Sequence, residues 1–278
     1  MTTNTGLIVP VDVAAYCVGV TDAADRTGDF AGATTNYENQ VSANPGVKAP
    51  AFLGVNVTRD HTQAPAWPLE SGVHLHWAMP DALTHANNTS GDLSFLPLPN
   101  RWLVTRVVIS GKAATGKSWI VESDTVSTTP PENNHVPTLP VQEADSTRGF
   151  RYVGARQILD DSWSVRTPPA GQTFKDLFRS DIHTVASGDI AFAAFYPNSR
   201  NIFGFYDDLA DLAGASANLM YVVTGWFSDA SNDPLSKSLT LEQIEEQFGW
   251  TFDNAAGAAP LYSLYNGTVQ GIEWNPDN

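Results

Sequence analysis

The chain of 278 residues carries 15 Lys and Arg against 30 Asp and Glu, which gives a formal net charge of −15 at pH 7. This balance argues against a nucleic-acid-binding protein and against a binder of anionic membrane surfaces, because both need basic patches. Hydrophobic residues at 42%, with 8 Trp, 8 Tyr and 13 Phe, suffice for a sizeable core and exclude wholesale disorder. The single cysteine, Cys17, excludes an internal disulfide and a multi-cysteine metal centre.

The first twenty residues do not have the pattern of a secretory signal peptide. They contain no basic segment, and Pro10 and Asp12 interrupt the apolar run. No later stretch reaches the roughly 18 consecutive apolar residues typical of a membrane-spanning helix. We therefore expect a protein that is cytoplasmic at synthesis and has no membrane insertion.

Short apolar runs separated by turn clusters dominate the chain. The segment 21–50 is polar and is predicted to be a long loop or arm. These runs are rich in β-branched and aromatic residues, which favour strands. The run 219–228 is apolar on both faces, which predicts a central strand. The predicted strands are residues 73–79, 101–110, 118–125, 150–158, 190–196, 202–206 and 219–228.

Residues 101–110 and 118–125 are predicted to form a hairpin around the loop GKAATGK. We expect Arg101 or Arg106 to pair across this hairpin with Glu122 or Asp124. The segment that begins at Gly111 and ends at Ser118 also matches the phosphate-loop pattern G-x-x-x-x-G-K-[ST]. A phosphate loop must open a helix, whereas β-forming residues follow here, so we interpret the segment as a hairpin turn without nucleotide-binding residues.

The segment 127–149 contains four prolines and is predicted to be a surface excursion or a linker. The chain is then one β-rich domain over residues 1–278, or two sub-domains, 1–126 and 150–278. The best helix signal covers residues 241–248, with Thr240 as N-cap, Gln243 completing a capping box and Gly249 as C-cap. Shorter helical turns are expected at 174–178 and 207–212. The predicted fold class is all-β, mainly antiparallel and β-sandwich-like, with one or two short helices.

His74 and His76 are two residues apart on a predicted strand, so their side chains share one face. This spacing suits two ligands of one zinc or iron ion, with Asp81, His85 or His61 as a third. The alternative is that both imidazoles simply form hydrogen bonds on the face opposite the core.

Asp229, Ser231 and Asp233 place oxygen-bearing side chains at alternate positions, as calcium-binding loops do. The pattern lacks the usual glycine, because Pro234 stands in its place, and an Asx turn explains it equally well. A further acidic run is predicted to be solvated or to cap a helix: Asp207, Asp208 and Asp211.

No catalytic residue is predicted. The nucleophile pattern G-x-S-x-G is absent, and Cys17 has no local partner that would lower its pKa. The eight tryptophans, spread from Trp67 to Trp274, are either core and sheet-face residues or a platform for stacking sugars.

Several blocks in order resemble the N-terminal region of a set of long, uncharacterised bacterial proteins. The resemblance runs from about residue 7 to residue 235 and implies a common organisation and no particular activity. It also implies that GKAATGK is a variable connection between two of the blocks. They are LIVPVDVAAYCVG, GVHLHWAMPDALTHA, PNRWLVTRVV, SWIVESD, AFAAFYPNSRNIFGFYDD and YVVTGWFSDASNDPL.

These observations favour a non-enzymatic structural or protein-interaction module of a larger bacterial assembly, whose partners are other protein subunits. The alternatives are a metal-dependent enzyme built on His74 and His76, and a carbohydrate-binding module that uses exposed tryptophans. No cofactor is predicted under the first hypothesis; zinc, iron or calcium belong to the alternative sites.

Overall fold

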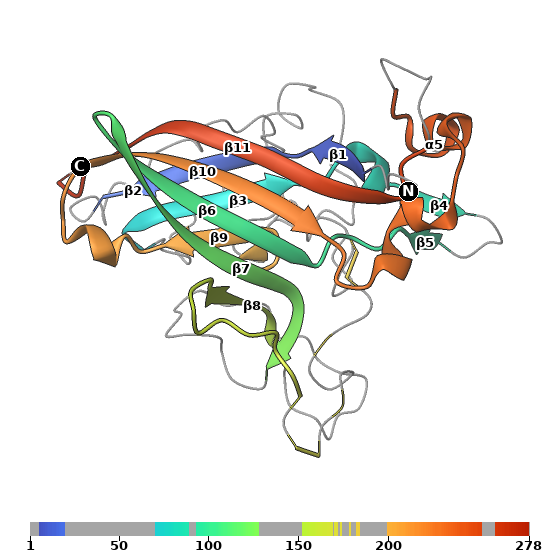
Figure 1. Ribbon diagram of the computed structural model, residues 1–278, viewed down its shortest axis with the longest axis horizontal. Helices are drawn as coiled ribbons and strands as arrows, with labels where there is room; N and C mark the ends of the chain where they lie inside the picture. Colours follow the sequence, from blue (N-terminus) through green and yellow to red (C-terminus); the bar gives the residue numbers. More distant parts are fainter. Residues whose placement is uncertain are drawn as a thin grey trace, which may run out of the picture.

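The computed structural model describes residues 6–19, 70–88, 93–127, 152–168, 170–171, 173, 178, 182–183, 199–251 and 259–277. Within these ranges two facing β-sheets form the body of the protein, and the larger sheet lies in front of the smaller in Figure 1. Antiparallel pairing dominates, so the predicted all-β, sandwich-like fold is confirmed.

The larger sheet has six strands in the order β1-β11-β10-β6-β7-β8. Its first pair, β1 with β11, is parallel, and its other pairs are antiparallel. The strands are β1 (Gly6–Pro10), β6 (Arg101–Ser110), β7 (Ala113–Ser127), β8 (Tyr152–Ile158), β10 (Ala217–Trp226) and β11 (Tyr262–Trp274).

The smaller sheet has three strands in the order β2-β3-β9, and a separate pair joins β4 to β5. These strands are β2 (Asp12–Val18), β3 (Gly72–Ala78), β4 (Ala86–Asn88), β5 (Leu93–Phe95) and β9 (Gly204–Asp207). The helices are α5 (Leu241–Phe248) and the 3₁₀ turns η2 (Asp81–Leu83), η5 (Ala210–Leu212), η6 (Ala230–Asn232) and η7 (Pro234–Lys237).

The N-terminal strands connect the two sheets directly. Only Val11 separates β1, at the edge of the large sheet, from β2 in the small sheet. Gly267 of β11 lies against this junction, where an added Cβ would be 2.3 Å from the carbonyl oxygen of Val11. The approach of the two backbones therefore requires a glycine at this position.

Aromatic side chains fill the space between the sheets. The rings of Trp77 and Trp102, one from each sheet, lie 5.3 Å apart, and Phe203 meets Trp102 edge-on at 6.3 Å. Further along, Trp119 packs on Phe205 at 4.9 Å. Strands β6 and β10 alternate buried inward and half-buried outward positions, as one-sided burial requires.

The predicted hairpin is confirmed, but its turn is shorter than expected. Strand β7 begins at Ala113, so only Gly111 and Lys112 form the turn, and Ala113 pairs with Ser110. Residues expected in the loop are strand because β6 provides hydrogen-bond partners along its whole length. Strand β10 lies inside the sheet as predicted, yet only its inward face is fully buried.

Local signals identify α5 correctly. The Thr240 side chain accepts from the backbone N–H of Gln243, the Gln243 side chain accepts from that of Thr240, and Gly249 ends the helix at φ 65°. Buried Ile244 and Phe248 pack on Leu235. The predictions for residues 21–50, 128–149, 174–177 and 190–196 lie outside the described residues.

Each of the two sheets contains strands from both of the sub-domains considered above, residues 1–126 and 150–278. Strand β6 pairs with β10, and β3 pairs with β9. In the described part of the chain, no helix has the length and apolar character needed to cross a membrane.

Candidate functional site

A buried ionic cluster lies between the sheets where β6, β9 and β10 come together. Arg106 and Asp207 are each 1% exposed, and Arg106 Nη1 lies 3.1 and 3.0 Å from the two carboxylate oxygens of Asp207. The Tyr221 hydroxyl donates to Asp207 at 2.9 Å, and Arg106 Nη2 donates to Asp211. Lys117 reaches Asp211 from the half-exposed side at 3.5 Å.

One expectation fails at this cluster, because Asp207 is buried and is neither solvated nor the N-cap of η5. Of the two arginines considered for pairing across the hairpin, Arg106 is the one that pairs elsewhere, with Asp207 and Asp211. The physical reason is the pleat: Arg106 points inward, to the same side as Trp102 and Val104. Asp208 and Asp211 are exposed, and the Asp208 side chain accepts from Ala210 N at 3.0 Å where η5 begins.

Burial perturbs the ionisation of the cluster. Desolvation raises the pKa of Asp207 despite the neighbouring Arg106 and the hydrogen bond from Tyr221. The pKa of Tyr221 is raised well above its usual value by burial and by Asp207. Tyr221 is therefore a protonated donor at neutral pH, and the geometry is that of a static link between the sheets.

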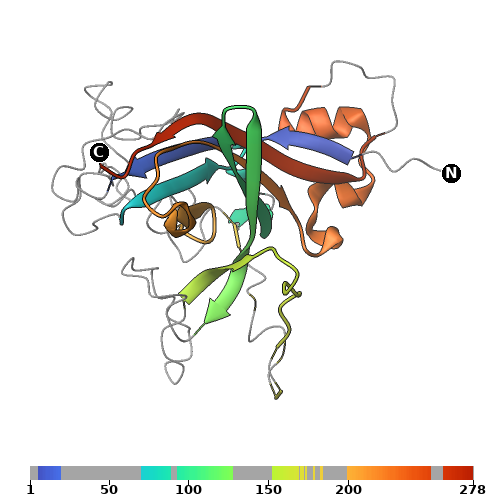
Figure 2. The ribbon, with the colours of Figure 1, turned by 60° about the vertical axis from the view of Figure 1, so that its left-hand side comes forward.

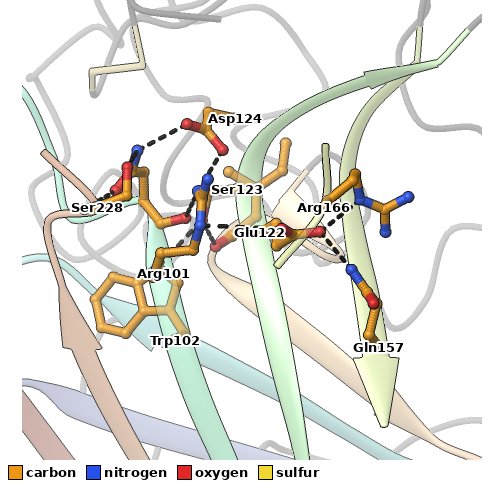
Figure 3. A network of polar contacts seen from close by, with 10 residues as sticks. Arg101, Trp102, Glu122, Ser123, Asp124, Gln157, Arg166 and Ser228 are labelled. Atoms are coloured by element: carbon orange, nitrogen blue, oxygen red, sulfur yellow. Dashed lines mark hydrogen bonds and ion pairs between the residues drawn. The ribbon is translucent and has the colours of Figure 1, made fainter. Parts of the chain in front are cut away.

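A second network surrounds the start of β6 and is drawn in Figure 3. Arg101 Nη1 donates to Asp124 at 2.5 Å, which confirms one of the expected pairings, and its Nε lies 4.0 Å from Glu122. Asn100 donates to Asp124 at 2.7 Å and to Ser228 at 2.9 Å, so it connects three segments. Desolvation raises the pKa of Asp124, although Arg101 and Asn100 oppose this shift.

The same network fixes the chain that follows β8. Glu122 is buried on the outward side of β7, where it accepts from Arg166 Nε at 2.7 Å and from Gln157 Nε2 at 3.0 Å. Figure 3 shows Arg166 and Gln157 approaching Glu122 from the β8 side. Residues 159–166 are thereby attached to β7 at both ends, because Leu159 N also donates to Ser118 O at 2.8 Å.

His74 is fully buried on the outward face of the small sheet. Its ring stacks on Tyr206 at 4.7 Å, and its Nε2 donates to the carbonyl oxygen of Glu70 at 2.8 Å. Arg200, also buried, pairs with the Glu70 carboxylate at 3.0 Å and lies over the Tyr206 ring. Burial raises the pKa of Tyr206 to about 12.

The residues considered as metal ligands are distributed as follows. His76 lies two positions along β3 on the same face as His74, half-buried. Asp81 and His85 are exposed at η2 and lie 3.4 Å from each other. Across the described residues, no group of three or more His, Cys, Asp or Glu side chains is arranged to hold a metal ion. His61 lies outside the described residues.

The residues considered for calcium serve as caps in the structure. The Asp229 side chain accepts from Ser231 N at 2.9 Å and from Ser231 Oγ at 2.7 Å. Asp233 accepts from Leu235 N at 2.9 Å and from Ser263 N at 2.6 Å, so it joins η7 to β11. The Asx-turn interpretation therefore describes the observed contacts.

Most described tryptophans are core residues. Trp77, Trp102, Trp119 and Trp274 are buried, whereas Trp163 is 36% exposed in the segment after β8. Trp67 is not among the described residues.

The outward side of β6 and β10 has an unusual composition for a sheet surface. We call it the uncharged face and define it by Leu103, Thr105, Val107, Met220, Val222 and Thr224. Four of these six side chains are apolar, although outward positions of an antiparallel sheet are commonly polar. None of the four packs against a core cluster. Figure 1 shows β10 and β6 side by side in front of the small sheet.

The two threonine hydroxyls of the uncharged face are already paired with side chains of the neighbouring strands. The Thr105 and Ser118 hydroxyls lie 2.9 Å apart, and Asn266 Nδ2 donates to Thr224 Oγ1 at 2.8 Å. Covering the face therefore leaves few hydrogen-bonding groups unsatisfied, which lowers the cost of removing water. The apolar stripe continues to Ile109, which is 42% exposed.

Comparison with known proteins finds no similar protein. No protein-family model matches it, and neither the curated proteins nor the solved structures contain a match.

Proposed function

We propose that this protein is a non-enzymatic structural and protein-interaction module of a larger bacterial assembly, and that the uncharged face binds a second copy of the chain. The observation that carries the proposal is the set of apolar outward residues on adjacent strands, Val107 opposite Met220 and Val222 opposite Thr105. These side chains are half-buried, and contiguous apolar surface that solvent reaches on a globular protein commonly marks an interaction site.

The net charge restricts where a second copy can bind. Two copies that each carry −15 repel one another, and the repulsion is weakest where the contacting surfaces bear no charge. The uncharged face offers such a surface. It is also continuous across two adjacent strands inside the sheet, which suits a self-complementary contact.

The buried polar clusters support a structural role. The polar contacts of Arg106, Asp207 and Tyr221 are made within the chain, and they join the two sheets. Asp233 likewise joins two elements. Such contacts keep a scaffold in one arrangement, which a subunit of an assembly requires.

The test is the mass of the full chain in solution, measured by light scattering after size exclusion over a wide range of concentrations. We expect a mass above the 30.0 kDa of one copy, and we expect Val222→Lys to return it to one copy. Ala230→Lys, which adds the same charge at exposed η6, is the matched control and should leave the mass unchanged. A wild-type chain that stays monomeric at every concentration would overturn the proposal.

A further inference from the structure

Exposed apolar side chains are concentrated in one short segment after β8. Four of the eight large hydrophobic side chains exposed among the described residues belong to it: Ile158, Leu159, Trp163 and Val165. We call residues 158–166 the arm. Trp163 is 36% exposed and Val165 is 69% exposed, so both are available for a contact. In Figure 2 the arm belongs to the yellow-green part of the chain that projects from the sandwich.

The arm is held in place even though its apolar side chains face solvent. Its start is bound to β7 through Leu159, and its end is bound through the ion pair of Arg166 with Glu122. Between them, Trp163 N donates to Asp160 O at 3.0 Å, and Asp160 Oδ1 accepts from Ser162 N at 2.8 Å. A segment ordered in advance loses little conformational entropy when it binds.

We infer that the arm of one copy docks on the uncharged face of a second copy, with Trp163 as the main anchor; this inference rests on the proposed function. Tryptophan is one of the residue types enriched among the dominant contacts of protein interfaces. The uncharged face provides the apolar surface that such an anchor needs.

Charges at the two surfaces are complementary. Asp160 and Asp161 are exposed on the turn of the arm. Lys112 is exposed at the β6–β7 turn beside the end of the uncharged face, and within the described residues it forms no ion pair. Lys112 of one copy can therefore approach Asp161 of the other, and this contact fixes which way the arm lies.

The position of the arm favours a twofold dimer. The arm is attached to Ser118 and Glu122 of β7, the strand next to β6, so it borders the uncharged face of its own chain. In a twofold arrangement each arm then covers the face of the other copy, and the dimer contains two identical contacts.

Two variants separate this arrangement from direct stacking of two uncharged faces. Trp163→Ser with Val165→Ser removes the arm anchor, and Val222→Lys disables the face. Each variant alone is expected to be a monomer of 30.0 kDa by light scattering. An equimolar mixture is expected to recover a dimer, because the intact arm of one variant meets the intact face of the other.

Charge exchange tests the orientation. Lys112→Glu alone and Asp161→Lys alone should each weaken the dimer about fivefold, as expected for rim charges. The two substitutions combined in one chain should restore most of the affinity, since every contact again joins opposite charges. Ser164→Ala, a conservative change within the arm, serves as the control for folding and mass.

The outcomes are distinguishable. A wild-type chain that is monomeric throughout overturns the proposed function together with this inference. A wild-type dimer that the Trp163→Ser, Val165→Ser variant leaves intact overturns only the arm contact and supports direct face stacking. The arm contact is also overturned if a mixture of the two variants stays monomeric although circular dichroism shows that each variant is folded.

Discussion

Arg106 of β6 and Asp207 of β9 form a buried ion pair that joins the two sheets of the sandwich, with Arg106 Nη1 3.0 Å from Asp207 Oδ2. Removing two charges from water is costly, and such a pair stabilises a fold only when further hydrogen bonds complete it. Tyr221 and the backbone N–H of Leu209 provide two of these bonds to Asp207. The arrangement therefore fixes how the sheets sit against each other more than it adds net stability.

Arg106→Met is expected to lower the free energy of unfolding by about 3–5 kcal/mol, because Asp207 remains buried without its countercharge. Urea unfolding followed by tryptophan fluorescence measures the loss. Lys117→Met is the matched control: its side chain is half-exposed, so its removal should cost under about 1 kcal/mol. If the two variants lose the same stability, the ion pair does not have this role.

The pairing of Arg106 with Asp207 could not be predicted from the sequence. Arg106 and Asp207 are 101 residues apart, and nothing local marks them as partners. Arg106 lies in a predicted strand and Asp207 directly follows one, but a strand pattern alone does not say which strand of the other sheet faces it. The acidic run was expected to be solvated or to cap a helix, which fits exposed Asp208 and Asp211 but not buried Asp207.

Features encoded by neighbouring residues were predicted far better. The capping box of α5 involves Thr240 and Gln243, three residues apart, so its signal lies within one turn of chain. The strand at 101–110 was likewise predicted with the observed bounds. The uncharged face was missed because its apolar residues come from β6 and β10, which become neighbours only through the sheet order.

Asp211, at the edge of the Arg106–Asp207 cluster, should make the free energy of unfolding depend on pH. Burial alone would raise the pKa of Asp211, but its hydrogen bond to Arg106 and the charges of Arg106 and Lys117 lower the pKa below 3.8. A carboxyl whose pKa is lowered by folding stabilises the protein above its unfolded pKa, and this contribution disappears as the pH falls through the folded value.

Wild type should therefore be more stable than Asp211→Asn at neutral pH, and the difference should shrink as the pH falls below 3.8. Urea midpoints of both proteins across the acidic range measure it. Asp208→Asn, an exposed neighbour, controls for the general loss of one negative charge. A difference between wild type and Asp211→Asn that grows on acidification would contradict the assignment.

Cys17 should react slowly with thiol reagents. Desolvation by burial raises the pKa of its thiol to about 11, so little reactive thiolate is present near neutral pH. We expect labelling of the native chain to be roughly a hundredfold slower than labelling of the same chain in urea, where the thiol has an ordinary pKa. As the single cysteine, it reports on β2 without interference. Equal rates in the two conditions would refute the burial argument.

The junction between β1 and β2 gives a sharp steric prediction. A Cβ at residue 267 would lie 2.3 Å from the backbone oxygen of Val11, and backbone cannot rotate away as a side chain can. Gly267→Ala should therefore destabilise the protein by about 2–3 kcal/mol. Gly116→Ala is the control, because its nearest atom would be at an ordinary 3.8 Å, and its unfolding midpoint should stay close to wild type. If both alanines shift the midpoint equally, the close approach of the two backbones is not what requires glycine at position 267.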